Sequence, residues 1–156
     1  MSFYLGGHAG FLVVAIATHA VVGYALGAVA FDRAGAGLVG GVAADVDLLV
    51  PAGVGEPLVH RGVTHGLFAL GIATAVGLAL GRATAGAVGI GYCSQLLIDA
   101  TTPMGVPLLS PVLATHFGVD AGVGGHSVPA TLALWVTSAG LLLIDRRVSI
   151  VRSTET

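Results

Sequence analysis

The chain contains a run of 22 residues, Gly10 to Phe31, without one formally charged side chain. Its most polar members are Thr18, His19 and Tyr24. An α-helix rises about 1.5 Å per residue, so this run is long enough to cross the roughly 30 Å of hydrocarbon in a bilayer. Because it lacks the basic residues that begin a signal peptide, we expect it to stay in the mature protein as a first membrane-spanning helix.

The whole chain has too few charges to cover a water-facing surface. Charged residues make up 9% of its 156 positions and hydrophobic residues 55%, whereas a soluble domain carries about 25% charged residues. There is no lysine and the net charge is −2, so we expect no nucleic-acid partner. The predicted fold class is all-α: one multi-pass helical membrane domain over residues 1–156, with membrane lipid around it. The sequence makes no prediction of the oligomeric state.

Four or five transmembrane segments are expected, followed by a polar tail at 145–156. Segment 34–50 is rich in glycine and carries two aspartates near its end, so it either spans the membrane or re-enters it. Thr64 is a suitable N-cap for the third segment. The predicted segments are 10–31, 34–50, 64–80, 84–100 and 128–144.

The arginines predict the orientation. If all five segments span, Arg33, Arg82 and three arginines of the tail lie on one side, and Arg61 lies alone on the other. The positive-inside rule then puts the C-terminus in the cytoplasm and the loop around Arg61 outside the cytoplasm. A re-entrant segment 34–50 moves Arg33 but leaves the rest of this orientation unchanged.

Most polar groups of the apolar segments fall on the predicted outer side. Asp45 and Asp47 end the second segment, His60 and His65 lie in the loop that follows and at the start of the third, and His19 is in the first. Gln95 and Asp99 are four residues apart and so share one face at the outer end of the fourth segment. Ionisable groups in membrane segments usually face a protein interior and mark function. We therefore expect these groups to meet.

Histidine and aspartate together suit a divalent cation, and zinc or manganese is expected. A cation at this place would offset the cost of burying the carboxylates and lower the pKa of a bound water to about 7. Arg61 beside the site is expected to hold an anion through its planar guanidinium. We interpret His8, His116 and His126 as surface or loop residues.

Each of these residues also has a simpler interpretation. His19 could bond to a neighbouring helix, His60 and His65 could lie among the lipid headgroups, and Asp99 could cap the following turn. Asp45 and Asp47 diverge on a regular helix, so both can act as ligands only if the backbone unwinds there. Their common location on one side favours a shared site.

Two sequence blocks also resemble a known family, the YdjM-type inner-membrane-associated proteins. One block is His60-Arg61-Gly62-Val63-Thr64-His65; the other runs from Asp99 through Thr102-Pro103 to Gly105-Val106-Pro107-Leu108-Leu109 and Pro111. Thr18-His19 with Gly23, Asp45-Val46-Asp47 and Gln95 extend the resemblance over residues 15 to 111. Members are described as metal-dependent hydrolases, and one as LexA-binding. The resemblance implies a similar activity and a similar ligand set.

The sequence departs from the family pattern at three positions. Ala44 stands where the family has proline, Gly66 where it usually has serine, and Gln95 where it has histidine. Glutamine is a poorer ligand for zinc-like ions than imidazole. Gln95 therefore stays among the predicted ligand positions but implies one imidazole fewer, another metal or no activity.

The function expected from these observations is hydrolysis of a phosphoester or other anionic substrate, including a lipid-derived one. A metal-bound hydroxide would attack the substrate, and the metal ligands would come from His19, Asp45, Asp47, His65, Asp99 and Gln95. Arg61 would hold the anion and His60 would be a general acid or a further ligand. Two alternatives remain: a non-catalytic metal- or proton-binding membrane protein, and a structural member of the family that has lost activity.

Overall fold

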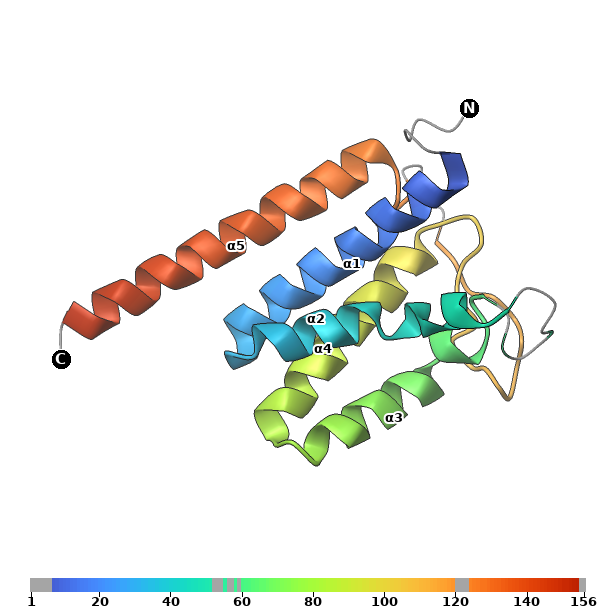
Figure 1. The fold of residues 1–156 in the computed structure, drawn as a ribbon, viewed down its shortest axis with the longest axis horizontal. Helices are drawn as coiled ribbons and strands as arrows, with labels where there is room; N and C mark the ends of the chain where they lie inside the picture. Colours follow the sequence, from blue (N-terminus) through green and yellow to red (C-terminus); the bar gives the residue numbers. More distant parts are fainter. Residues whose placement is uncertain (1–6, 52–54, 56–57, 59, 120–123, 155–156) are drawn as a thin grey trace.

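The computed structural model describes residues 7–51, 55, 58, 60–119 and 124–154, and this part of the chain contains helices and no strand. The helices α1, α3 and α5 run in one direction and α2 and α4 in the other, so the long connections gather at one end (Figure 1). The elements are α1 Gly7–Phe31, α2 Ala34–Val42, the 3₁₀ helices η1 Ala44–Leu49 and η2 Val63–His65, α3 Leu67–Leu78, α4 Arg82–Ala100 and α5 Val128–Thr154.

The second predicted segment is two elements rather than one. The α-helix α2 has only 9 residues, and the chain continues as the 3₁₀ helix η1 from Ala44. A 3₁₀ helix winds more tightly than an α-helix. The side chains of Asp45 and Asp47 therefore point in different relative directions on η1 from those they would have on an α-helix. Both aspartates thus lie on the irregular backbone that their use in one site requires.

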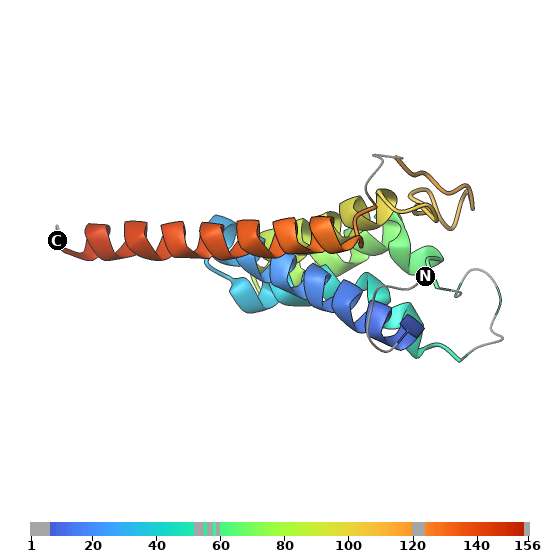
Figure 2. The ribbon, with the colours of Figure 1, turned by 90° about the horizontal axis from the view of Figure 1, so that it is seen from above.

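The third and fifth segments also differ from the predicted bounds. α3 begins at Leu67 after an extended Gly66, and Thr64 belongs to η2 instead of capping α3. The side chain of Thr64 donates to Asp47 at 2.9 Å. α5 continues through Asp145–Arg147 to Thr154, so the expected polar tail is helical as far as the chain is described. In both views α5 projects well beyond the other helices (Figures 1 and 2).

Fewer helices are long and apolar enough to cross a membrane than the four or five expected. Within the described residues there are 2, namely α1 and the part of α5 from Val128 to Val151. α3 is apolar but has only 12 residues. α4 has 19 residues, but its buried face includes Ser94, Gln95 and Asp99. Gln95 and Asp99, which were expected to belong to the site, lower the hydrophobicity of α4.

Glycines let α2 pack directly on the backbones of α1 and α4. A Cβ atom on Gly37 would lie 2.2 Å from the carbonyl oxygen of Gly23, and one on Gly91 would lie 2.1 Å from the carbonyl oxygen of Gly37. Likewise, a Cβ on Gly41 would lie 2.5 Å from the carbonyl oxygen of His19. These contacts hold α2 against α1 beside His19, and so bring η1 close to the site end of α1 and α4.

We predict that Gly37→Ala destabilises the protein by about 1–3 kcal/mol, because the added methyl group meets backbone atoms that cannot rotate away. Thermal unfolding of the purified protein in detergent would show this as a lower Tm. Gly35→Ala is the matched control on the same helix, since a Cβ there meets nothing within 4 Å. Equal Tm values for the two variants would contradict the close packing of α2.

Candidate metal centre

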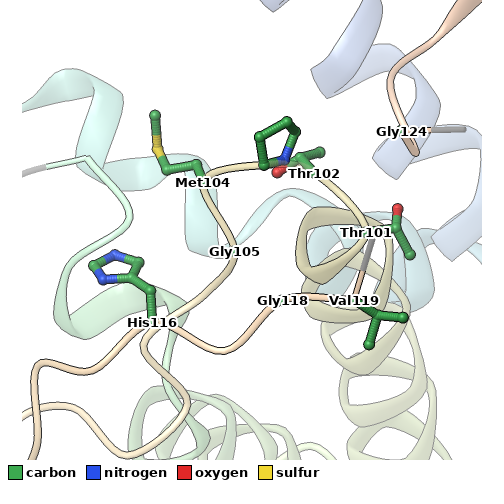
Figure 3. A pocket seen from close by; sticks show the side chains of 9 residues that line it. Thr101, Thr102, Met104, Gly105, His116, Gly118, Val119 and Gly124 are labelled. Carbon is green, nitrogen blue, oxygen red and sulfur yellow. The ribbon is translucent and has the colours of Figure 1, made fainter. Parts of the chain in front are cut away.

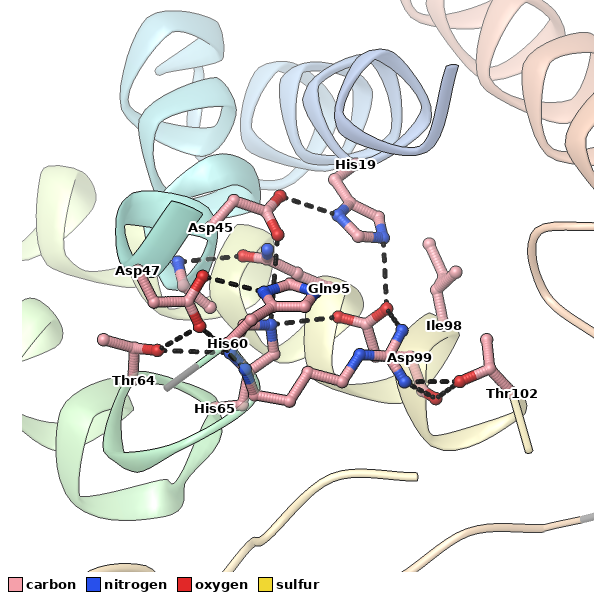
Figure 4. A network of polar contacts seen from close by, with 12 residues as sticks. His19, Asp45, Asp47, His60, Thr64, His65, Gln95, Ile98, Asp99 and Thr102 are labelled. Carbon is pink, nitrogen blue, oxygen red and sulfur yellow. Dashed lines mark hydrogen bonds and ion pairs between the residues drawn. The ribbon is translucent and has the colours of Figure 1, made fainter. Parts of the chain in front are cut away.

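The site end of the bundle contains a buried group of histidines and aspartates, here called the His–Asp cluster (Figure 4). α1 contributes His19, α4 contributes Asp99 near its last turn, and η1 and η2 contribute Asp45 and His65. His126, two residues before the start of α5, completes the set. The cluster thus consists of His19, Asp45, His65, Asp99 and His126, and joins five parts of the chain that are distant in sequence.

Two of the histidines are oriented by carboxylates. The Nδ1 atom of His19 lies 3.1 Å from Oδ2 of Asp45, and Nδ1 of His65 lies 3.1 Å from Oδ2 of Asp47. A carboxylate on one ring nitrogen fixes the tautomer and leaves the other nitrogen as a ligand, which is the usual arrangement in metal sites. The Nε2 atoms of both rings are directed toward Asp99, at 3.8 Å for His19 and 3.4 Å for His65.

Three buried polar atoms at the centre of the cluster lack a hydrogen-bond partner among the described residues. They are Nε2 of His19, Nε2 of His65 and Oδ2 of Asp99. A buried polar atom without a partner costs about 1–3 kcal/mol. One cation could bind the lone pairs of both imidazole nitrogens and of the carboxylate oxygen at the same time. The donor set therefore fits a metal ion.

Asp47 supports the cluster from outside. Its carboxylate, 4% exposed, accepts hydrogen bonds from the backbone N–H of Arg61 and from the side chain of Thr64, both at 2.9 Å, and meets Nδ1 of His60 at 2.9 Å as well as His65. Burial alone would raise the pKa of Asp47, but the contacts with His60 and His65 outweigh it and hold that pKa well below its usual range. Asp47 is thus a charged anchor for the His60–His65 loop.

The pKa of His65 is shifted in the opposite direction. Burial by itself lowers it, but the close contact with Asp47 and the negative charges of Asp47 and Asp99 raise it to about 9. The same carboxylates that attract a proton to His65 would attract a metal cation to it, and the two compete for the ring.

Arg61 occupies a different place from the one expected. Its guanidinium is buried at 7% exposure and its Nη2 donates to Oδ1 of Asp99 at 2.6 Å. Its Nη1 donates to the side chain of Thr102 and, at 3.1 Å, to the carbonyl oxygen of Gly105. These bonds neutralise Asp99 and fasten the loop after α4, so the guanidinium is engaged within the protein instead of presenting a free fork to an anion.

Gln95 contacts the backbone at the start of η1 (Figure 4). Its side chain is completely buried, and its Oε1 accepts a hydrogen bond from the backbone N–H of Ala44 at 3.1 Å. This bond satisfies the N–H group at the change from α2 to η1. The residue expected as a weak ligand is thus placed to support the backbone that carries Asp45 and Asp47.

His126 is the member that sequence reasoning missed. It was interpreted as a surface or loop residue, but it is 7% exposed and its Nε2 lies 2.9 Å from Oδ1 of Asp99. One nitrogen each of His19 and His126 and one oxygen of Asp99 lie within 4.8 Å of one another. The available signal was topological: His126 directly precedes the last segment, and so lies at the same end as the predicted site.

Two pockets lead into the cluster. A cavity of about 20 Å³, enough for a water molecule or an ion, is lined by His19, Asp45, His60, Asp99 and His126 together with apolar side chains. A larger pocket of about 430 Å³, here called the access pocket, shares Phe11, Leu12, Leu48, His60, Arg61 and His126 with that cavity. The half-exposed His60 ring therefore lies between the cluster and the access pocket.

A separate pocket of about 550 Å³ lies beside the loop after α4 (Figure 3). It is lined by Thr101 to Gly105, His116, Gly118, Val119 and Gly124. None of the histidines and carboxylates of the His–Asp cluster lines it. His116 faces this separate pocket and is exposed, as the sequence suggested.

Together these features define an all-α protein with two bilayer-length helices and a buried His–Asp cluster that could hold a metal ion. The sequence profile of the YdjM inner membrane protein family matches residues 14–153, so the chain belongs to this family. This confirms the resemblance and extends it to α5. Neither the curated proteins nor the solved structures include a significant match to the chain.

We predict that Asp47→Asn weakens zinc or manganese binding about 10–100-fold. The N–H₂ group of the asparagine would face the hydrogen-bond donors that converge on Asp47. His65 would then no longer be held in its orientation. Competition with a fluorescent chelator measures the affinity. Asp32→Asn is the control, since Asp32 is fully exposed beyond the opposite end of α1. Unchanged affinity in Asp47→Asn would exclude an orienting role for this carboxylate.

Proposed function

We propose that this protein is a membrane-embedded, metal-dependent hydrolase of phosphoesters. The observation that carries the proposal is the convergence of three buried atoms, on His19, His65 and Asp99, that make no hydrogen bond within the described part of the chain and lie next to a pocket that reaches the surface of the bundle. Membership of an inner membrane protein family is consistent with it.

The protein groups that would hold the cation are Nε2 of His19, Nε2 of His65 and the carboxylate of Asp99, with Asp45 and His126 next to them. Imidazole and carboxylate donors suit zinc or manganese. When bound, such an ion supplies Lewis acidity and lowers the pKa of a coordinated water to about 7.

His60 is the group placed to move a proton. Its Nδ1 lies 2.9 Å from Asp47, and its ring is 34% exposed and lines the access pocket. In hydrolysis the oxygen of water forms a bond to phosphorus and the bond from phosphorus to the ester oxygen breaks. The leaving oxygen needs a proton. His60 would donate that proton from Nε2 while Asp47 holds the ring. The proton that the water gives up would restore the one lost by His60.

The proposal predicts hydrolysis of phosphodiesters by purified protein loaded with zinc or manganese. Methyl phenyl phosphate and methyl p-nitrophenyl phosphate differ by one nitro group, which makes p-nitrophenolate a leaving group that needs a proton much less. His60→Gln should lower kcat for the phenyl ester about 10²–10⁴-fold and much less for the p-nitrophenyl ester, with metal content unchanged. His65→Ala should lose both metal and activity, and His116→Gln, an exposed control at the same end, neither.

Absence of hydrolysis in a fully metal-loaded protein would contradict the enzymatic proposal. That result would favour a second function, a non-catalytic cation-binding membrane protein. The specific observation for it is the size of the inner cavity, about 20 Å³, which suits an ion and not a substrate. Negligible metal in both the wild type and His65→Ala would contradict both functions.

We also propose that the chain crosses the membrane several times, with the His–Asp cluster on the extracytoplasmic side. Arg33 and Arg82 flank the turns at the end opposite the cluster. Arg146 and Arg147 lie in the C-terminal half of α5, and the C-terminal part of this helix extends past that end (Figure 1). The positive-inside rule places this arginine-bearing end in the cytoplasm. The shorter α2 and α3 would cross only as parts of the bundle, where protein covers their irregular ends.

This orientation predicts opposite labelling of two introduced cysteines in a Cys93→Ser background. Ala114→Cys lies on the exposed loop at the cluster end, and Leu80→Cys replaces a side chain that is 76% exposed at the α3–α4 turn. A membrane-impermeant maleimide should label the first in intact cells and the second only in inverted membrane vesicles. The reverse pattern would contradict the proposed orientation.

A further inference from the structure

One face of α1 leads from the start of the helix to the cluster. Its residues recur at intervals of three and four, so they share one side of the helix. The first of them line the access pocket, the later ones line the inner cavity, and Phe11 and Leu12 line both. In order along this face they are His8, Phe11, Leu12, Ala15, Ile16 and His19.

The access pocket is apolar along its length and polar where it meets the cluster. Its apolar walls come from Phe11 and Leu12 of α1, Leu48 of η1, and Pro103 and Met104 of the loop after α4. Its volume of about 430 Å³ lies in the range of pockets that bind small molecules. A ligand that fills it needs an apolar portion for these walls.

The polar end of the same pocket determines which chemical group the other end of the ligand can carry. His60, Arg61 and His126 line both the access pocket and the inner cavity, so this end adjoins the site that would hold the cation. A cation held by the cluster would attract an anionic group to this end of the pocket. The two ends together describe an amphiphile with an anionic head.

The position of the pocket along α1 indicates where such a ligand would come from. The pocket is lined by residues of the first two turns of a helix that has 25 residues and is long enough to cross a bilayer. The end of a spanning helix lies at the level of the lipid headgroups. A membrane lipid at this level has its phosphoester near the cluster and its acyl chain beside the apolar walls.

We infer that the access pocket binds the hydrocarbon chain of an amphiphilic phosphoester, a membrane phospholipid, and so selects the substrate of the proposed hydrolase. This inference rests on the proposed function. It assigns Leu12, Leu48 and Met104 to the recognition of the chain, a role distinct from that of the His–Asp cluster.

The test compares methyl p-nitrophenyl phosphate with octyl p-nitrophenyl phosphate on the metal-loaded protein in nanodiscs. Because methylene groups in an apolar pocket discriminate strongly, kcat/KM should be at least about tenfold higher for the octyl ester. Leu12→Ser and Met104→Ser should remove most of this preference. Met104 is 57% exposed, so its replacement is tolerated by the fold. Val13→Ser, on the exposed opposite face of α1 at 67% exposure, is the matched control.

Equal kcat/KM values for the two esters would overturn the inference. So would an octyl preference that both pocket variants retain, since it would then come from partition of the ester into the bilayer. If neither ester is hydrolysed, the hydrolase proposal fails and binding decides. Calorimetric titration should then show octylphosphonate binding about tenfold more tightly than methylphosphonate, with the difference lost in Leu12→Ser; equal affinities would overturn the inference independently of activity.

Discussion

The carboxylate of Asp99 is the group on which the rest of the site depends. It is 1% exposed, and an isolated charge at such a depth is too costly to persist. Arg61 at 2.6 Å and His126 at 2.9 Å meet one of its oxygens, and His65 meets the other at 3.4 Å. These partners lie on two connections: Arg61 and His65 on the His60–His65 loop, and His126 on the connection that leads into α5. One carboxylate therefore fixes the His60–His65 loop, the end of α4 and the start of α5 in one arrangement.

Backbone contacts decide which other groups reach Asp99. Gly37 and Gly41 let α2 lie against α1 with no side chain between them, next to the turn that carries His19. The chain then tightens into η1, and the amide of Gln95 accepts the N–H of Ala44 at that change. Asp45 consequently turns toward His19, while Asp47 turns toward His60 and His65. The glycine spacing of α2 therefore helps to set the positions of the two aspartates of η1.

Much of this arrangement could be predicted because few polar groups exist in so apolar a chain. Histidine and aspartate on one predicted side had few other partners, and the structure does bring His19, Asp45, His65 and Asp99 together. The number of helices that are long and apolar enough to span the membrane was overestimated for the described residues, because hydrophobicity does not report that α2 ends after 9 residues or that α3 has only 12. The position of His126 beside Asp99 and the hydrogen bonds of Arg61 depend on the path of the loop over residues 101–119. Glycine and proline mark such a loop but do not predict its path.

Charge balance offers a physical reason why such a cluster can exist in so apolar a chain. Asp45, Asp47 and Asp99 contribute three negative charges, and Arg61 contributes one positive charge. With neutral histidines the group carries a net charge of −2, which a divalent cation would cancel. Burial strongly penalises any remaining charge, so the cluster favours either a cation or protons on its histidines, and the raised pKa of His65 is the second of these responses. The same balance explains why Arg61 is directed inward: as a free anion receptor at the surface, it would leave Asp99 one positive charge short.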